Sequence, residues 1–358
     1  MEDRRVTIND IADELGLSTA TVSNVLHGKT NKVSDRTVKK VQEVLEKRQY
    51  IPSMAGILLA QNNSRIIGVV INDHPKYESH VLEDGFIASA LNALSTEIEK
   101  NGQFMMIKKA VKMNDIIRFA SMWNLDGLVL LGYCERDYRY LRDHMRIPFV
   151  VYDGYQVESD RVCNITIDHY DGGFQMGEYF KKLGHKHCLC ISDNEICMDK
   201  ERYEGFCAGL GRKADFLMIP MEKEKRDAFY LEKLDELKSY SAVFAVSDYY
   251  AIDFMKFLQS HGILVPKDIS VAGFDDSSLC TLVTPALTSI RQDNELRAQT
   301  ALDKLRELNA NQYDLKTDKF ESQNDERKKD KECKKEIRLP VMLVERESVK
   351  AVEMSMMG

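Results

Sequence analysis

From residue 66 onward, short runs of apolar residues alternate with longer stretches whose apolar residues recur at helical spacing. This alternation constrains the fold more than any other feature, because strands separated by helices pair in parallel and form sheets covered by helices. At 358 residues the chain exceeds what one compact core normally holds, so we expect two or three domains. The expected strands cover residues 66–71, 104–107, 127–131, 149–152, 188–191, 242–246 and 269–274.

Six of these seven strands are followed at once by polar or aromatic side chains. Ligands of open parallel sheets bind at the carboxyl ends of the strands, so two such sheets facing each other would enclose a cleft lined by carboxylates, hydroxyls and tyrosines. Such a lining suits a polyhydroxylated ligand, because carboxylates accept hydrogen bonds from hydroxyl groups. For each residue alone the competing interpretation is a helix N-cap, and we expect Asp248 to be a cap rather than a ligand group.

Residues 6–50 are expected to form three short helices. Thr7, Ser18 and Ser34 stand where the N-caps of these helices belong, and Gly16 and Gly28 are suited to end the first two. The expected spans are 8–15, 19–27 and a third helix after residue 34. Residues 28–48 carry seven basic and three acidic side chains, whereas the whole chain has a net charge of −7. A local basic face on an acidic molecule indicates an anionic partner for this part of the chain.

Two short helices joined by a turn that contains glycine are typical of a helix-turn-helix, whose second helix lies in the major groove of DNA. The residues that face outward from the second helix are small or hydrogen-bonding, so they can approach base edges and phosphates. An ordinary three-helix bundle with a solvated polar face explains the same spacing about as well. The outward residues are Thr19, Ala20, Thr21, Ser23, Asn24 and His27.

The segments VTINDIA (6–12), GLS (16–18), TVSNVL (21–26) and YIP (50–52) resemble the N-terminal head of the LacI/GalR family of bacterial transcription regulators. The resemblance is ungapped through both helices and implies sequence-specific binding to double-stranded DNA. The DNA contacts that we expect are Thr7, Ser18, Thr19, Ala20, Thr21, Ser23, Asn24, His27, Lys32, Ser34, Thr37, Tyr50 and Leu59.

Two residues of the second helix depart from the family pattern. Asn24 stands where the family often has arginine, and His27 stands where it often has asparagine. Arginine favours guanine, whereas asparagine pairs with adenine through two hydrogen bonds. We therefore expect operator half-sites that depart from the usual sequence of the family at the base that faces Asn24.

Residues 52–61 resemble the hinge helix of the same family, in which a leucine enters the minor groove. By register this leucine is Leu59, and an apolar wedge of this kind kinks DNA. The alternative is that Leu59 and its apolar neighbours pack against the core. Gly56, where the family usually has alanine, lowers the stability of a helix, so we expect the hinge to fold only on DNA.

The resemblance continues through the body, in IDH (167–169), LGH (183–185), VPKDISVAGFDD (265–276) and TPALTSI (284–290). It implies a regulatory core similar to periplasmic sugar-binding proteins. On this resemblance Arg202 and Asp275 are the best candidates for effector contacts. Many relatives also have an aromatic residue that stacks on the effector, and residues 221–226 supply none. The remaining candidates for effector contacts are Asn72, Asp73, Asp153, Asp168 and Ser247.

The expected fold class is an all-α helix-turn-helix head with a hinge helix, followed by an α/β body of two Rossmann-like subdomains with parallel sheets. A helix over 293–308 should pack on the first subdomain, and a strand over 339–345 should return to the second. The expected boundaries are 1–50 for the head and 51–64 for the hinge and linker, 65–162 with 291–310 for the first subdomain, 163–290 with 337–350 for the second, and 311–336 for a charged loop insertion.

Other chemistries find little support in the sequence. Residues 185–190 hold four potential metal ligands, but strand alternation sends neighbours to opposite faces, and the spacing is not that of a zinc site. Gly205, Gly209 and Gly211 are not followed by the Gly-Lys-Ser/Thr of a phosphate-binding loop. The cysteines lack a Cys-x-x-Cys pair, so we expect reduced thiols. We expect neither an enzyme, nor a bound metal, nor a cofactor.

The sequence therefore predicts a cytoplasmic homodimer, with a tetramer as a further possibility, that binds a pseudo-palindromic operator under the control of a small effector, a sugar or sugar derivative. The cytoplasmic expectation rests on the lack of an apolar signal-peptide core and of a membrane-spanning run. Two alternatives stay open: a regulator controlled by a protein partner, and a solute-binding protein without a role on DNA. The choice between inducer and corepressor also stays open.

Overall fold

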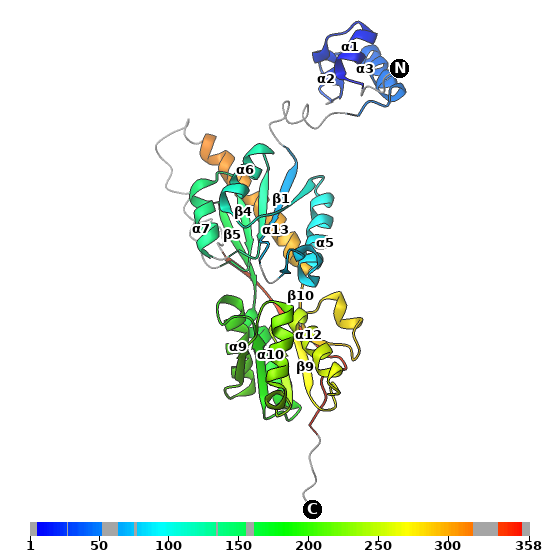
Figure 1. Cartoon of the computed structure of the whole chain (residues 1–358). Helices are drawn as coiled ribbons and strands as arrows, with labels where there is room; N and C mark the ends of the chain where they lie inside the picture. Colours follow the sequence, from blue (N-terminus) through cyan, green and yellow to red (C-terminus); the bar gives the residue numbers. More distant parts are fainter. Residues whose placement is uncertain are drawn as a thin grey trace, which may run out of the picture. The chain divides into compact units, whose positions relative to one another are not determined.

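The structure is a computed structural model that describes residues 6–26, 28–51, 64–74, 77–133, 135–154, 161–317 and 336–352. It divides the chain into two compact units, Met1–Ser64 and Arg65–Gly358 (Figure 1). No helix in these ranges is both long enough and apolar enough to cross a membrane.

The first unit contains three helices, α1 (Ile8–Leu15), α2 (Thr19–Leu26) and α3 (Asp35–Lys47). Their starts and the end of α1 agree with the sequence prediction. Ile11, Val22 and Val41, one from each helix, are fully buried and form the centre of a small apolar core. This core holds α1 and α2 in a fixed relation, which a helix-turn-helix requires.

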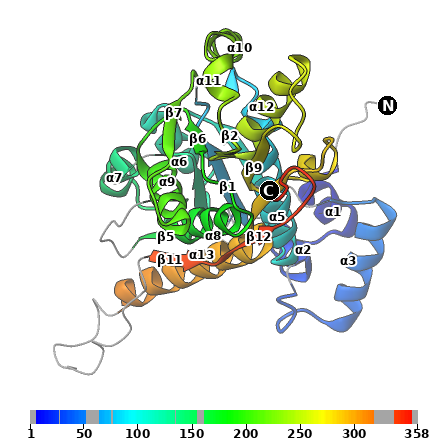
Figure 2. The ribbon, with the colours of Figure 1, turned by 90° about the horizontal axis from the view of Figure 1, so that it is seen from below.

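The second unit is built on two six-stranded sheets with helices around them (Figures 1 and 2). Sheet A has the order β11-β5-β4-β3-β1-β2 and is parallel throughout. Its strands are β1 (Ile66–Ile71), β2 (Phe104–Lys109), β3 (Gly127–Leu131), β4 (Phe149–Tyr152), β5 (Val162–Ile167) and β11 (Glu336–Leu339). With η2 (Val81–Glu83), α5 (Gly85–Lys100), α6 (Met113–Met122), α7 (Glu135–His144) and α13 (Asn294–Thr317), it forms the first subdomain.

Alternate residues of sheet A face different helices. Ile67 and Val69 belong to a core shared with α5 and α13, whereas Ile66 and Val70 belong to a second core with α6 and α7. A sheet covered on both faces has strands that are apolar throughout, which is why β1, β3 and β4 were recognisable from the sequence.

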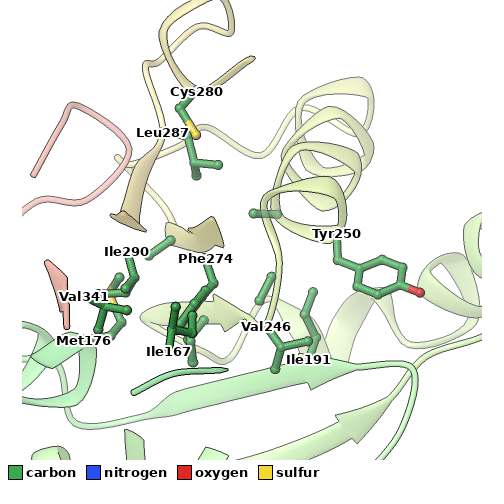
Figure 3. Packing of buried hydrophobic residues seen from close by; sticks show 14 of the residues in the cluster. Ile167, Met176, Ile191, Val246, Tyr250, Phe274, Cys280, Leu287, Ile290 and Val341 are labelled. Atoms are coloured by element: carbon green, nitrogen blue, oxygen red, sulfur yellow. The ribbon is translucent and has the colours of Figure 1, made fainter. Parts of the chain in front are cut away.

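Sheet B has the order β12-β10-β9-β8-β6-β7, and only β12 runs antiparallel. Its strands are β6 (Cys188–Ser192), β7 (Asp215–Met218), β8 (Ala242–Ala245), β9 (Ser270–Asp275), β10 (Thr288–Gln292) and β12 (Val341–Val344). With α8 (His169–Lys182), α9 (Cys197–Leu210), α10 (Lys223–Glu232), α11 (Leu234–Leu237), α12 (Asp248–Ser260) and η3 (Ser278–Thr281), it forms the second subdomain. Phe274 of β9 is buried close to Ile167, Ile290 and Val341 (Figure 3).

The chain passes between the two sheets three times: from β5 to α8, from β10 to α13, and from β11 to β12. The predicted fold class, a helix-turn-helix head followed by two parallel-sheet subdomains, is confirmed.

Several predicted boundaries are wrong. We expected the first subdomain to end at residue 162, but β5 belongs to sheet A and the chain crosses only after Ile167. The polar residues Asn164 and Thr166 hid this strand from the sequence pattern, although all its residues are buried. The single strand expected over 339–345 is two strands in different sheets. Pro340 separates them, because proline has no N–H to continue a ladder.

The last long helix also differs from expectation. We expected a helix over 293–308 followed by a loop, but α13 continues to Thr317, so the first part of the expected loop at 311–336 is helical. Residues 318–335 lie outside the described part of the chain.

Helices α8 and α9 pack against each other so closely that glycine is required at the positions where they touch. Figure 2 shows the two helices on the same side of the body. A Cβ atom on Gly173 of α8 would lie 2.0 Å from the carbonyl oxygen of Arg202, and one on Gly205 of α9 would lie 2.0 Å from that of Tyr170. Gly177 and Gly209 repeat the pattern along the pair. The close packing fixes the position of α9, and with it Arg202, relative to the start of α8.

Gly173→Ala should lower the free energy of unfolding by at least about 2 kcal/mol, because the added methyl group meets backbone that cannot move aside. Urea unfolding followed by circular dichroism measures the change. Glu178→Ala, at an exposed position of the same helix, is the control and should change stability by less than about 0.5 kcal/mol. Equal stability of Gly173→Ala and the wild type would contradict the close packing.

Candidate functional site

In the head, side chains cap the N-termini of both helices of the helix-turn-helix, α1 and α2. The Thr7 hydroxyl accepts from the amide of Asp10 at 3.3 Å, and Asp10 Oδ2 accepts from the amide of Thr7 at 2.7 Å, so the expected N-cap Thr7 forms a capping box with Asp10. Gly16 then takes a left-handed conformation with φ 64°, which suits glycine. At the start of α2, Ser18 Oγ accepts from the amide of Thr21 at 3.2 Å.

The expected DNA contacts lie at different depths. His27 and Leu59 lie outside the described residues. Thr7, Thr21, Ser23, Thr37 and Tyr50 are half-buried, and Ser18, Thr19, Ala20, Asn24, Lys32 and Ser34 are exposed. Thr19, Ala20 and Asn24 thus leave one face of α2 open to a partner. The exposed N-termini of α2 and α3 add backbone amides, which favour phosphate.

In the body, Asp153 follows β4 at the carboxyl edge of sheet A and forms a buried ion pair. Its Oδ1 lies 2.6 Å from Nη2 of Arg297 on α13, and the side chain of Arg297 is fully buried. The same guanidinium donates to the carbonyl oxygen of Ile165 at 2.9 Å and lies over Tyr152, 4.1 Å from the ring centre. Burial by itself raises the pKa of Asp153, but Arg297 and a hydrogen bond from His169 outweigh it and hold the pKa well below its usual range.

Arg202 and Asp275 come together on the side of the second subdomain. Arg202, which is 5% exposed, packs its guanidinium on Phe274, with the central carbon 3.7 Å from the ring centre. Nη1 donates to the carbonyl oxygen of Val246, and Nη2 lies 4.0 Å from Oδ1 of Asp275. Burial raises the pKa of Asp275 well above its ordinary value, although Arg202 opposes the shift.

Both of these carboxylates sit on strained backbone. Asp153 has φ 55° and Asp275 has φ 120°, in the region that favours glycine. Non-glycine residues in such conformations cost about 1–3 kcal/mol each and cluster at functional sites. The strain therefore supports a functional role for these two strand ends.

The remaining candidates for effector contacts make local contacts. Asn72 Nδ2 donates to the carbonyl oxygen of Gly132 at 2.8 Å, and Asp73 Oδ2 lies 3.1 Å from Nζ of Lys109. Asp168 is the N-cap of α8 and accepts from the amide of Asp171 at 2.9 Å. The structure therefore pairs Asp153 with Arg297 and Arg202 with Asp275 at the interface of the subdomains. Asn72, Asp73 and Asp168 make their contacts with other groups.

The prediction that Asp248 caps α12 is wrong, because Ser247 is the N-cap. Asp248 instead points into the core, where Oδ2 accepts from the amide of Ser277 at 2.7 Å and Oδ1 accepts from the hydroxyl of Ser289 at 2.5 Å. Burial raises its pKa to about 6 against these hydrogen bonds. Ser247, expected as an effector contact, has its hydroxyl engaged by the amide of Tyr250.

Arg297 was not expected from the sequence. It lies on a helix assigned to packing, and the residue type alone gives no sign that a charged side chain there is fully buried. The role of Arg297 becomes visible only in the structure, because its partner Asp153 is remote in the sequence. In the region 221–226, where an aromatic residue was sought, Arg226 is fully buried and its Nε donates to Asp253 at 2.7 Å.

A helix-turn-helix head joined to two α/β subdomains with charged groups at their interface defines a class of DNA-binding regulators whose body is built like a ligand-binding protein. A model of bacterial regulatory proteins of the lacI family matches residues 7–53, and a model of a periplasmic binding protein-like domain matches residues 178–349.

Known proteins agree with this class. The HTH-type transcriptional repressor PurR of Vibrio atlanticus is 28% identical over 316 residues, which cover 84% of this chain and 91% of that protein. The crystal structure of the lac repressor dimer bound to operator and the anti-inducer ONPF matches with a TM-score of 0.78 and 22% identity over 97% of this chain and 100% of that chain. The complex of the transcriptional regulator CelR with cellobiose matches with a TM-score of 0.64 and 21% identity over 96% and 100%.

The chain carries a DNA-binding head of the lacI family and a periplasmic binding protein-like body. It is a DNA-binding transcription regulator, and the family that its head matches is one of regulatory proteins.

Arg297→Met should lower the free energy of unfolding by about 3–5 kcal/mol, because it leaves the charge of Asp153 buried without its partner. Urea unfolding at pH 7 measures this change. Arg291→Met is the matched control, since Arg291 pairs with Asp276 at 2.6 Å but is 48% exposed, and it should cost less than about 1 kcal/mol. Equal losses in the two variants would show that the buried pair contributes no more than a surface pair.

Proposed function

We propose that this chain is a cytoplasmic, homodimeric transcription repressor that binds a pseudo-palindromic operator. Its affinity for that operator changes when a small polyhydroxylated effector occupies the interface between the two subdomains. Residues 1–50 contact the operator, and residues 51–64, with Leu59, link the head to the body and enter the minor groove. The protein acts by binding and not by catalysis.

The observation that carries the proposal is the exposed face of α2 on a capped helix-turn-helix. Thr19, Ala20 and Asn24 are exposed there and are small or hydrogen-bonding. Lys32 is exposed, and so are the first residues of α3, which follow α2 in the sequence. The Lys32 side chain and the backbone amides at the start of α3 suit contacts with phosphate, which position a protein on DNA. Relatives named as transcriptional repressors support the repressor role.

Exposed leucines support the homodimer. Leu82 in η2, Leu279 in η3 and Leu282 just after η3 are 43%, 44% and 76% exposed. The two segments meet, because Gly85 at the start of α5 packs against Ser277 and Leu279. Exposed leucines on two neighbouring segments are suited to a symmetric contact with a second copy, and a dimer presents two heads to matched half-sites.

The effector class follows from the groups at the interface of the subdomains. Arg202 can donate to hydroxyl or ring oxygens, and Asp275 can accept from hydroxyl groups or, when protonated, donate to them. The complex of the related CelR fold with cellobiose supports a carbohydrate. The alternative of control by a protein partner predicts a body that binds no small molecule.

Asn24 is expected to prefer adenine at one symmetric pair of operator positions, and Asn24→Arg should shift this preference to guanine by about 1–3 kcal/mol per half-site. Selection of bound duplexes from a random pool by the full chain, followed by sequencing, measures the preference. Gln42→Ala, at an exposed position outside the expected DNA contacts, should select the wild-type sequence. Recovery of no sequence above background would overturn the proposed function, and a guanine preference already present in the wild type would overturn the role of Asn24.

Arg202→Ala and Asp275→Ala should each weaken effector binding by at least about 30-fold, because truncating a buried hydrogen-bonded charge costs about 2–5 kcal/mol. Calorimetric titration of the full chain with ribose, cellobiose, sugar phosphates and purine bases identifies the ligand and measures the loss. Both variants should retain operator binding, and Lys200→Ala, which is exposed on α9, should behave as the wild type. Heat from no sugar or sugar phosphate would contradict the carbohydrate assignment.

A further inference from the structure

Two side chains that the proposed function does not use connect the two buried charge pairs. His169 Nε2 donates to Asp153 Oδ1 at 3.1 Å, and His169 Nδ1 accepts from Nε of Arg202 at 3.2 Å. One imidazole thus joins the pair of the first subdomain, Asp153 and Arg297, to the pair of the second, Arg202 and Asp275.

Gln292 makes the corresponding connection on the other side. Its Nε2 donates to Asp275 Oδ1 at 2.6 Å, and its Oε1 accepts from Nη1 of Arg297 at 3.2 Å. Together the contacts close a ring of six side chains in which each subdomain contributes a cation and a carboxylate. We call this set the six-residue ring: Asp153, His169, Arg202, Asp275, Gln292 and Arg297.

The two connecting residues lie where the chain passes between the sheets. His169 is the first residue of α8, just after the chain leaves β5, and Gln292 is the last residue of β10, just before α13. A change in the angle between subdomains is absorbed by a few residues at such element ends. The hydrogen bonds of His169 and Gln292 must therefore move or break whenever the subdomains turn relative to each other.

His169 can make both of its contacts only when it is neutral, with the proton on Nε2. Burial, opposed by the carboxylate of Asp153, lowers its pKa to about 4. The charged groups that face it come from every neighbouring element: Asp153 after β4, Arg297 on α13, Arg202 on α9 and Asp275 on β9, with Asp168 and Asp171 at the start of its own helix. At neutral pH the ring is therefore complete.

We propose that His169 and Gln292 are positioning residues that couple the effector-binding pair Arg202 and Asp275 to the Asp153–Arg297 pair of the first subdomain. The binding of an effector between the subdomains is transmitted through these two side chains, which lie where the chain passes between the sheets. The inference rests on the proposed function and adds to it the route by which the effector site and the head influence each other, which must be reciprocal.

Isosteric variants separate the two contacts of His169. His169→Gln keeps an N–H at the position of Nε2 for Asp153 but offers no acceptor to Arg202, whereas His169→Asn keeps an acceptor at the position of Nδ1 and loses the reach to Asp153. Gln292→Met removes both contacts of the second connection at nearly constant volume. Gln175→Met is the matched control, since Gln175 also joins two elements, with contacts of 2.6 Å to Asp171 and 3.2 Å to the Val341 carbonyl oxygen, but lies outside the ring.

The test uses the full chain and the operator duplex recovered by selection as the probe. Hydrogen exchange followed by mass spectrometry is measured with and without that duplex, on peptides that contain Asp153 and Asp275. In the wild type and in Gln175→Met, operator binding should change the exchange rates of these peptides. In the double variant His169→Gln/Gln292→Met the change should be lost, while the affinity for the operator remains measurable.

The outcomes separate this inference from the proposed function. If no operator is recovered, the proposed function fails. If an operator is recovered but the double variant retains the wild-type response, or the wild type shows no response at these peptides, the inference is overturned while DNA binding stands. Equal loss of the response in Gln175→Met would reduce His169 and Gln292 to packing roles and would also overturn it.

Stability measured as a function of pH distinguishes the proposed role of His169 from simple packing, because packing alone does not depend on protonation. Because folding lowers the pKa of His169 from 6.5 to about 4, the unfolded chain takes up the proton first as the pH falls. The stabilisation from neutral His169 is thus complete above pH 6.5 and is lost progressively as the pH falls toward 4. The stability difference between the wild type and His169→Asn should shrink over this interval, and a difference that stays constant with pH would contradict the neutral, doubly bonded imidazole.

Discussion

The organisation of the body depends on two buried arginine side chains, Arg202 and Arg297. A guanidinium cannot lose its proton in a protein, so each must find a carboxylate and further acceptors within the interior. Asp275 lies 4.0 Å from Arg202 and Asp153 lies 2.6 Å from Arg297, one pair in each subdomain. Under the proposed function, an effector that competed for Arg202 or Asp275 would perturb a network in which each buried charge depends on the others.

The secondary structure brings these charges together by two devices. The glycine contacts between α8 and α9 place Arg202 next to the first turn of α8, where His169 stands. The positive φ values of Asp153 and Asp275 turn each carboxylate back at the end of its strand. The strained strand ends and the start of α8 therefore meet through His169 and Arg202, although only the start of α8 follows directly on a passage of the chain between the two sheets.

Much of the fold was predictable from the sequence, because β1, β3, β4 and the three head helices carry strong local patterns. The strand β10 did not, since Ile290 is its only apolar residue and its other buried side chains are satisfied by hydrogen bonds such as that from Ser289 to Asp248. At the site, Arg202 and Asp275 were expected from the family resemblance. His169, Gln292 and Arg297 were not. Arg297 contacts Asp153 from more than a hundred positions away, and no local pattern records the burial of any of the three side chains. The exchange of roles between Ser247 and Asp248 has the same origin, since two adjacent polar residues before a helix look alike until one of them is buried.

The central claim is that the six-residue ring acts as one unit across the two subdomains, and a double-mutant cycle between Arg202 and Arg297 tests it most directly. The two arginines are linked through His169, Gln292 and the carboxylates, so the free energies of unfolding of Arg202→Met, Arg297→Met and the double variant should be non-additive by at least about 1 kcal/mol. The same cycle in a His169→Gln/Gln292→Met background should be additive to within about 0.5 kcal/mol. Additive effects already in the wild-type background would contradict the account, because they would mean that each subdomain holds its own charge pair independently of the other.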